Sequence, residues 1–171
     1  MTKMHYLKIT HALQYTNKEV PPLTFVDKFQ MVRQIMYEFN KLYKQEYLSL
    51  WMNCVNKSMN SWLKKYSPGF ISFPQKLHPF GNKYHLISAG DNGHVIMWRI
   101  KLVEGKDCSK LLNRKWAFEL QWECKYPNAP TVMRLLEITE PIHWTGKIVT
   151  GDSGFCVTRG VLALREIGMS G

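Results

Sequence analysis

The sequence predicts an α/β fold, in which helices pack on a mixed sheet. Three observations lead to this prediction. Apolar residues recur with a helical period after Asp27, residues 48–55 alternate with a period of two, and further strands and helices then follow along the chain. The length of 171 residues fits one domain.

The first 46 residues predict a helical lead-in. Residues 1–17 have a weak helical spacing, which the prolines at 21–22 interrupt because proline lacks an amide donor. Asp27 is a suitable N-cap for a stronger helix. The apolar stripe of that helix is expected to pack into the core, and it consists of Phe29, Val32, Ile35, Met36, Phe39, Leu42 and Tyr43.

Residues 47–171 predict the main part of the domain. Residues 48–55 are expected to form a strand with Met52 and Cys54 on its apolar face, and residues 58–79 are expected to be irregular. Residues 84–89 and 95–104 predict two strands joined at Gly90-Asp91-Asn92-Gly93, a sequence typical of a hairpin turn. The polar and basic residues near 105–130 are interpreted as a loop insertion.

The last part of the chain predicts a helix, a strand and a helix. Thr131 is expected to cap a helix over residues 131–139, which Pro141 ends. Residues 147–150 form a short predicted strand, and Asp152 comes directly after it. A final helix is expected from Val157 until Gly168, a glycine at a typical helix end.

Charge gives the first indication of a partner. The chain has 23 Lys and Arg against 13 Asp and Glu, a formal net charge of +10. This balance favours nucleic acid, then an anionic membrane surface, although a basic protein without such a partner remains an alternative. No run of apolar residues is long enough to span a membrane, and no apolar signal core predicts secretion. Four widely spaced cysteines argue against a disulfide scaffold and a zinc ribbon.

Several ordered blocks of this sequence resemble piggyBac-type transposases, from about Tyr6 to Gly171. The stretch Asn56-Lys57-Ser58-Met59 stands where these transposases have Asp-Glu-Ser-Met, and Thr150-Gly151-Asp152-Ser153 resembles the segment with their second catalytic aspartate. Further similar blocks are Pro68-Gly69-Phe70, His78-Pro79-Phe80-Gly81-Asn82 and Val103-Glu104-Gly105-Lys106-Asp107.

The resemblance implies a ribonuclease-H-like fold with a three-carboxylate (DDE or DDD) active site. It also implies DNA cleavage and strand transfer with two Mg²⁺ ions, and a nuclear location, with the cytoplasm as the alternative. Two hard divalent cations need several oxygen ligands and clamp the attacking and leaving oxygens of a phosphoryl transfer.

The sequence departs from this pattern at the metal ligands. Asn56 replaces the first aspartate, Lys57 replaces the adjacent glutamate, and Asp152 remains as the second carboxylate. The family's third carboxylate and its zinc-binding region correspond to positions after Gly171. We therefore expect a partial, C-terminally truncated ribonuclease-H-like fold without retained Mg²⁺ or catalysis. A protein partner or a second copy of the chain is expected to complete the sheet.

Two alternatives to an inactive transposase core remain open. The first is a DNA- or partner-binding protein that reuses the fold, with phosphate contacts from Lys57, Lys64, Lys65 and Arg99 and stacking by Trp62 and Trp98. The alternative for these residues is a solvated surface with buried tryptophans. The second is an active metal-dependent nuclease. Asp152 could instead cap a helix, and the histidines are interpreted as structural because none has metal-ligand spacing.

Overall fold

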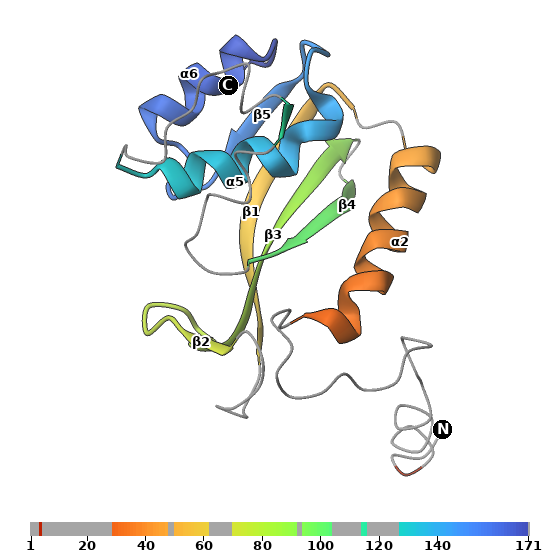
Figure 1. Cartoon of the computed structure of the whole chain (residues 1–171), viewed down its shortest axis with the longest axis vertical. Coiled ribbons are helices and arrows are strands. Elements are labelled where there is room, and N and C mark those ends of the chain that lie inside the picture. The colour runs from red at the N-terminus through yellow and green to blue at the C-terminus, as the bar shows by residue number, and fades with distance from the viewer. Residues whose placement is uncertain are drawn as a thin grey trace.

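The computed structural model describes residues 29–47, 50–61, 70–91, 94–103, 114–115 and 127–170, together with Met4. Figure 1 shows the helices and strands of these residues. In chain order they are α2 (Gln30–Glu46), β1 (Met52–Ser61), β2 (Phe70–Ser72), β3 (Phe80–Asp91), β4 (His94–Leu102), α5 (Ala129–Thr139), the 3-10 helix η1 (Glu140–Ile142), β5 (Ile148–Gly151) and α6 (Thr158–Glu166).

A five-stranded mixed sheet forms the centre of the described residues, with the order β2-β3-β1-β5 and with β4 also paired to β3. β3 pairs antiparallel with β1, β2 and β4, whereas β5 pairs parallel with β1. A parallel pair needs a long crossover connection, and α5, which lies between β4 and β5 in the chain, packs against the sheet. The predicted hairpin is confirmed, because Asp91 of β3 pairs with His94 of β4.

The prediction for the first strand was wrong in position and in face. β1 runs from Met52 to Ser61 because β3 pairs with it from Asn53 to Ser61 and β5 pairs with Met52. Asn53 and Val55 are its buried residues, while Met52 and Cys54 are exposed. Asn53 can be buried because its Oδ1 accepts a hydrogen bond from Trp98 Nε1 at 3.1 Å and its Nδ2 donates to the Leu50 carbonyl at 3.1 Å.

The segment 58–79 is also more regular than expected, since it contains the end of β1 and all of β2. β3 begins at Phe80 rather than at Tyr84. Gly81 permits the close pairing of β3 with β1 at this end of the two strands. Its φ is +154°, and a Cβ at this position would collide with the carbonyl oxygen of Asn60.

The helix ends differ from the predicted caps. α5 begins at Ala129 after Asn128, which has a left-handed φ of 65°, and Thr131 makes no capping hydrogen bond there. The predicted end of the last helix is confirmed. Gly168 has a φ of 69°, and the Met169 amide donates to the Leu164 carbonyl at 2.9 Å, as in a glycine-terminated helix.

Helix α2 packs along the edge strand β4, and its apolar stripe is only partly covered. Phe29 is buried, but Val32, Ile35 and Leu42 are exposed, so the expected core packing of the whole stripe was wrong. The Asn40 side chain makes two hydrogen bonds across the contact between α2 and β4. Asn40 Nδ2 donates to the Ile100 carbonyl at 2.8 Å, and its Oδ1 accepts from the Ile100 amide at 2.9 Å.

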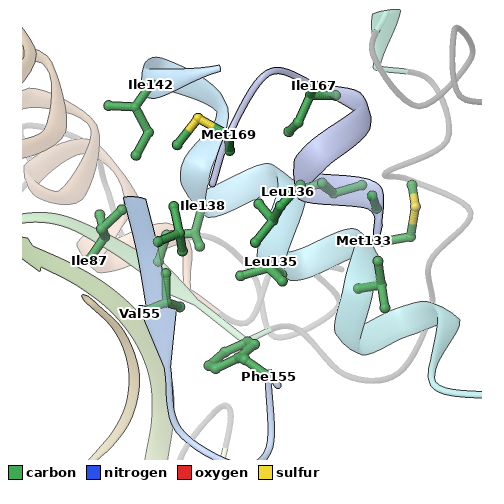
Figure 2. Close-up of a cluster of buried hydrophobic side chains, with 14 of the residues drawn as sticks. Val55, Ile87, Met133, Leu135, Leu136, Ile138, Ile142, Phe155, Ile167 and Met169 are labelled. Atoms are coloured by element: carbon green, nitrogen blue, oxygen red, sulfur yellow. The ribbon is translucent and has the colours of Figure 1, made fainter. Parts of the chain in front are cut away.

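The core lies between one face of the sheet and helices α5 and α6. Figure 2 shows Val55 and Ile87 of the central strands facing Leu135 and Ile138 of α5, with Phe155 closing one end. Residues after α6 complete this layer. Ile167 and Met169 are buried, and Ser170 forms a parallel bridge with Ile148 of β5.

Two predictions remain outside what the structure tests. The division into a lead-in of residues 1–46 and a core of residues 47–171 stays a prediction, and most of residues 105–130 lie outside the described ranges. Among the described helices, none is long and apolar enough to cross a membrane.

Candidate functional site

Strands β1 and β5 bring the two predicted site positions together. Val55 of β1 pairs in parallel with Gly151 of β5, so the next residues on the two strands are Asn56 and Asp152. Neighbouring strands lie about 4.8 Å apart, so the backbones of these two positions lie close together where the β1–β5 pair ends. The sequence predicted that these two positions belong to one site through the family resemblance.

The Asp152 carboxylate is held by groups of its own chain. Its Oδ1 lies 3.7 Å from Lys57 Nζ and accepts a hydrogen bond from the Gly154 amide at 3.0 Å. Asp152 does not cap a helix, because α6 begins only at Thr158 after Val157. It instead starts a tight turn, in which its carbonyl accepts from the Phe155 amide at 2.9 Å.

Lys57 is packed in place rather than extended into solvent. Its side chain is 20% exposed, and Nζ lies 4.6 Å from the centroid of the Phe155 ring, a cation–π distance. The absence of a side chain at Gly154 makes room for Lys57, because a Cβ at residue 154 would overlap Lys57 Nζ. Asn56 faces the opposite side of the strand, where its Oδ1 accepts a hydrogen bond from the Lys57 amide at 2.7 Å.

Sequence reasoning treated His85 as merely structural, but it lies inside this site. It pairs with Lys57 across the two central strands and meets Phe155 edge-on at 4.8 Å between ring centroids. The side chain is 3% exposed, and its buried Nε2 has no hydrogen-bond partner. Burial, and to a lesser extent the nearby positive charges of Lys83, Arg134 and Lys57, lower the pKa of His85 from 6.5 to about 3, so the ring is neutral.

Two further cations, which sequence reasoning missed, complete what we call the basic cluster: Lys57 of β1, Lys83 of β3 and Arg134 of α5. Lys83 Nζ lies 5.0 Å from the centroid of the Phe73 ring. Burial lowers the pKa of Lys83, and the charges of Lys57 and Arg134 lower it further. Burial also lowers the pKa of Arg134. A strand predicted to begin at Phe80 would have Lys83 and His85 on the same face, because side chains alternate with a period of two.

Of the other basic residues proposed for DNA contact, the structure describes Arg99. Lys64 and Lys65, with Trp62, lie outside the described residues. Arg99 is engaged with α5, since its guanidinium donates to the Glu137 carbonyl at 3.2 Å and lies 3.6 Å from Glu140 Oε2. Trp98 is buried and bonded to Asn53, so it offers no stacking face to a base.

Comparison with known proteins gives the family. A family model described as Transposase IS4 matches residues 1–170. The chain belongs to the Transposase IS4 family. The resemblance to piggyBac-type transposases is confirmed, because the structure is similar to a piggyBac transposase solved as a synaptic complex with hairpin DNA, with a TM-score of 0.72 at 15% sequence identity. A comparison with curated proteins finds no match.

The same likeness confirms the predicted α/β, ribonuclease-H-like fold of this Transposase IS4 family member. It covers 99% of this chain and 32% of the piggyBac transposase chain, so the chain spans about a third of that protein's length. The mixed sheet, the parallel β1–β5 pair and the helices on its face all belong to the matched part.

The Mg²⁺ ions that the resemblance implies do not fit the donors present here. The pair Asn56 and Asp152 offers one carboxylate, and the Lys57 ammonium lies 3.7 Å from it. The amide oxygen of Asn56 accepts a hydrogen bond from its own chain. Across the described part of this Transposase IS4 family chain, no three His, Cys, Asp or Glu residues gather into a metal-binding group. A divalent cation here would be repelled by the Lys57 ammonium and would lack the two acids that Asn56 and Lys57 replace.

The neutral, buried His85 predicts that the folded protein loses stability in acid. The unfolded chain takes up a proton near pH 6.5, whereas the folded chain does so only near pH 3. The unfolded state therefore binds more protons in this window, so stability is complete above pH 6.5 and falls as the pH decreases toward 3. The expected loss is about 1.4 kcal/mol per pH unit.

Urea unfolding of the wild type and of His85→Phe, followed from neutral to acidic pH, measures this slope. The variant keeps a ring against Phe155 but cannot titrate, so its stability should fall less steeply with decreasing pH. His143, whose pKa burial lowers from 6.5 to about 4, contributes a slope of the same sign in both proteins. Equal slopes in the two proteins would show that His85 is not the group responsible.

Proposed function

We propose that this transposase-derived chain is a DNA-binding protein that no longer cleaves DNA with metal ions. The observation that supports the loss of cleavage is the ion pair of Lys57 Nζ with Asp152 Oδ1 at 3.7 Å. The single carboxylate at the site is already neutralised by a cation of the chain. With an effective dielectric constant of about 20, one positive charge about 5 Å away opposes a divalent cation by roughly 6 kcal/mol before screening.

DNA binding is supported by charge and by kinship. The net charge of +10 favours a negatively charged partner. The basic cluster contains one cation each from β1, β3 and α5. The similar piggyBac transposase was solved with hairpin DNA. A protein that retains the DNA-facing fold but lacks the metal ligands would bind DNA, in the nucleus, without cutting it.

Incubation with Mg²⁺ or Mn²⁺ and DNA substrates with varied ends tests the loss of cleavage. We expect no metal-dependent nicking by the wild type, and none by Asn56→Asp, because the Lys57 ammonium still neutralises Asp152 in that variant. Reproducible metal-dependent nicking that disappears in Asp152→Ala would contradict the proposal.

The double variant Asn56→Asp/Lys57→Glu offers a second, non-catalytic measurement. It removes the ammonium and places a glutamate beside Asp152 together with an aspartate at the first ligand position, so Mn²⁺ should raise its melting temperature through preferential binding to the folded state. The wild type should show no such shift. A wild-type shift as large as that of the double variant would mean that metal binding survives the lysine.

A further inference from the structure

The basic cluster has more positive charge than the protein itself compensates. Among the described residues, Asp152 is the one carboxylate that pairs with Lys57, and neither Lys83 nor Arg134 has an ion pair. Asp152 acts on Lys83 and Glu137 acts on Arg134 only in the sense that each raises the pKa of its neighbour against the larger effect of burial. Half-buried cations without anions are costly, because burial removes their water while their neighbours repel them. An anion held among them would relieve both effects.

The geometry of the central strands suits one tetrahedral anion. Lys57 pairs with His85 and Met59 pairs with Lys83, so Lys57 and Lys83 are diagonal neighbours on the face that α5 covers. Such positions lie about 7–8 Å apart, and the long side chains of two lysines can meet at one group between them. Arg134 of α5 is near enough for its charge to lower the pKa of both Lys83 and His85, and its planar guanidinium suits the oxygens of a phosphate.

His85 adjoins the basic cluster and has an unpaired polar atom. Its Nε2 is buried without a hydrogen-bond partner, and the residue lies on the same face directly across from Lys57. A neutral imidazole has one N–H donor and one acceptor, and a phosphate oxygen can accept a hydrogen bond from the N–H. Buried polar atoms are rarely left unpaired in a folded protein.

We propose that Lys57, Lys83 and Arg134 form a metal-independent site for one phosphate group of the DNA backbone, in which the Lys57 ammonium takes over the charge that a metal ion would supply. This inference rests on the DNA binding proposed above. Asp152 does not contact the anion and competes with it for Lys57 through the ion pair.

The role of Asp152 gives a prediction opposite to that for a metal ligand. In a metal-dependent site, Asp152→Asn would weaken the interaction with DNA. Here the substitution releases a lysine from its counter-ion, so the affinity for a duplex oligonucleotide in EDTA should rise about tenfold. Gly154→Ala should act in the other direction without changing the net charge, because its Cβ displaces Lys57 Nζ.

Fluorescence anisotropy with a labelled duplex, over a range of salt concentrations and in EDTA, measures these effects. Lys83→Met keeps the packing volume against Phe73, and it should lower the affinity and reduce the salt slope by about one phosphate contact. Lys83→Arg should retain most of the binding. Lys41→Ala is the matched control, since Lys41 is exposed on α2 and pairs only weakly with Glu38 at 3.9 Å. Melting curves show whether each variant is folded.

Inorganic phosphate distinguishes a phosphate site from diffuse attraction. At matched ionic strength it should displace the duplex from the wild type better than chloride does, and this advantage should disappear in Lys83→Met. If Lys83→Met, Lys57→Ala and Lys41→Ala weaken DNA binding equally, the DNA-binding proposal stands but the site is refuted. If the wild type shows no salt-dependent DNA binding, the proposed function itself fails.

Discussion

Replacement of Phe155 by alanine is expected to lower the free energy of unfolding by about 3–5 kcal/mol. The ring is 2% exposed and lies between the core and the candidate site. It contacts His85 edge-on at 4.8 Å and carries Lys57 Nζ at 4.6 Å from its centroid. Removing it therefore eliminates a buried hydrophobic surface, an aromatic contact and a cation–π contact together.

The packing around Phe155 also limits how far the variant could relax. The ring lines one side of an existing cavity of about 220 Å³ between β5 and α6, whose other walls include Leu135 and Leu164. Deleting the ring would enlarge this space rather than create a small void that neighbours could close, which places the cost in the upper part of the usual range.

Chemical unfolding monitored by circular dichroism measures this loss. Leu162→Ala is a suitable control, because Leu162 is exposed on α6 and its truncation should change stability by less than about 0.5 kcal/mol. Similar losses in the two variants would mean that Phe155 does not contribute to the core as described. Phe155→Ala should also release Lys57 from its position, which links this residue to the DNA-binding measurements.

Replacement of Glu137 by alanine is expected to lower the free energy of unfolding by about 2–3 kcal/mol. Its buried carboxylate joins α5 to β4, with Oε1 at 2.7 Å from Lys101 Nζ and at 3.6 Å from a guanidinium nitrogen of Arg114. Its loss would leave two cations without their counter-ion. The cost stays below that of a fully buried pair because both cations are partly exposed and can turn toward water.

Glu137→Gln separates charge from volume. The amide can still accept from Lys101 but carries no charge, so this variant should lose less stability than Glu137→Ala. Glu38→Ala is the surface control, because the Glu38–Lys41 pair is exposed at 3.9 Å and should contribute at most about 0.5 kcal/mol. A loss for Glu137→Ala no larger than for Glu38→Ala would show that this network does not hold α5 to the sheet.

The sequence predicted the fold class and the order of elements where local chemistry decides them. The Asp91–His94 hairpin and the glycine-terminated last helix follow from turn residues whose backbone preferences are strong. The face of β1 could not be predicted, because apolar alternation assigns Asn53 to the surface. Its burial depends on Trp98, a partner 45 residues away. The packing of α2 on an edge strand likewise depends on tertiary contacts that a helical period does not reveal.

The candidate site was predictable only in part for the same reason. Asn56 and Asp152 were found through the family resemblance, and the parallel register of β1 and β5 brings their backbones close together directly after the Val55–Gly151 pair. The ion pair of Lys57 with Asp152, and the inclusion of His85, depend on the register of β1 against both of its neighbours. That register was not accessible from strands whose ends had been misplaced by several residues.

The two hydrogen bonds between Asn40 and Ile100 bear on how the molecule can associate with others. Outer strands normally present free amides and carbonyls that invite an additional strand from another chain. Here a side-chain amide already occupies both groups of Ile100, as an incoming strand would. Addition of a strand to β4 at this point therefore requires α2 to detach first, so α2 protects this edge of the sheet from aggregation with other chains.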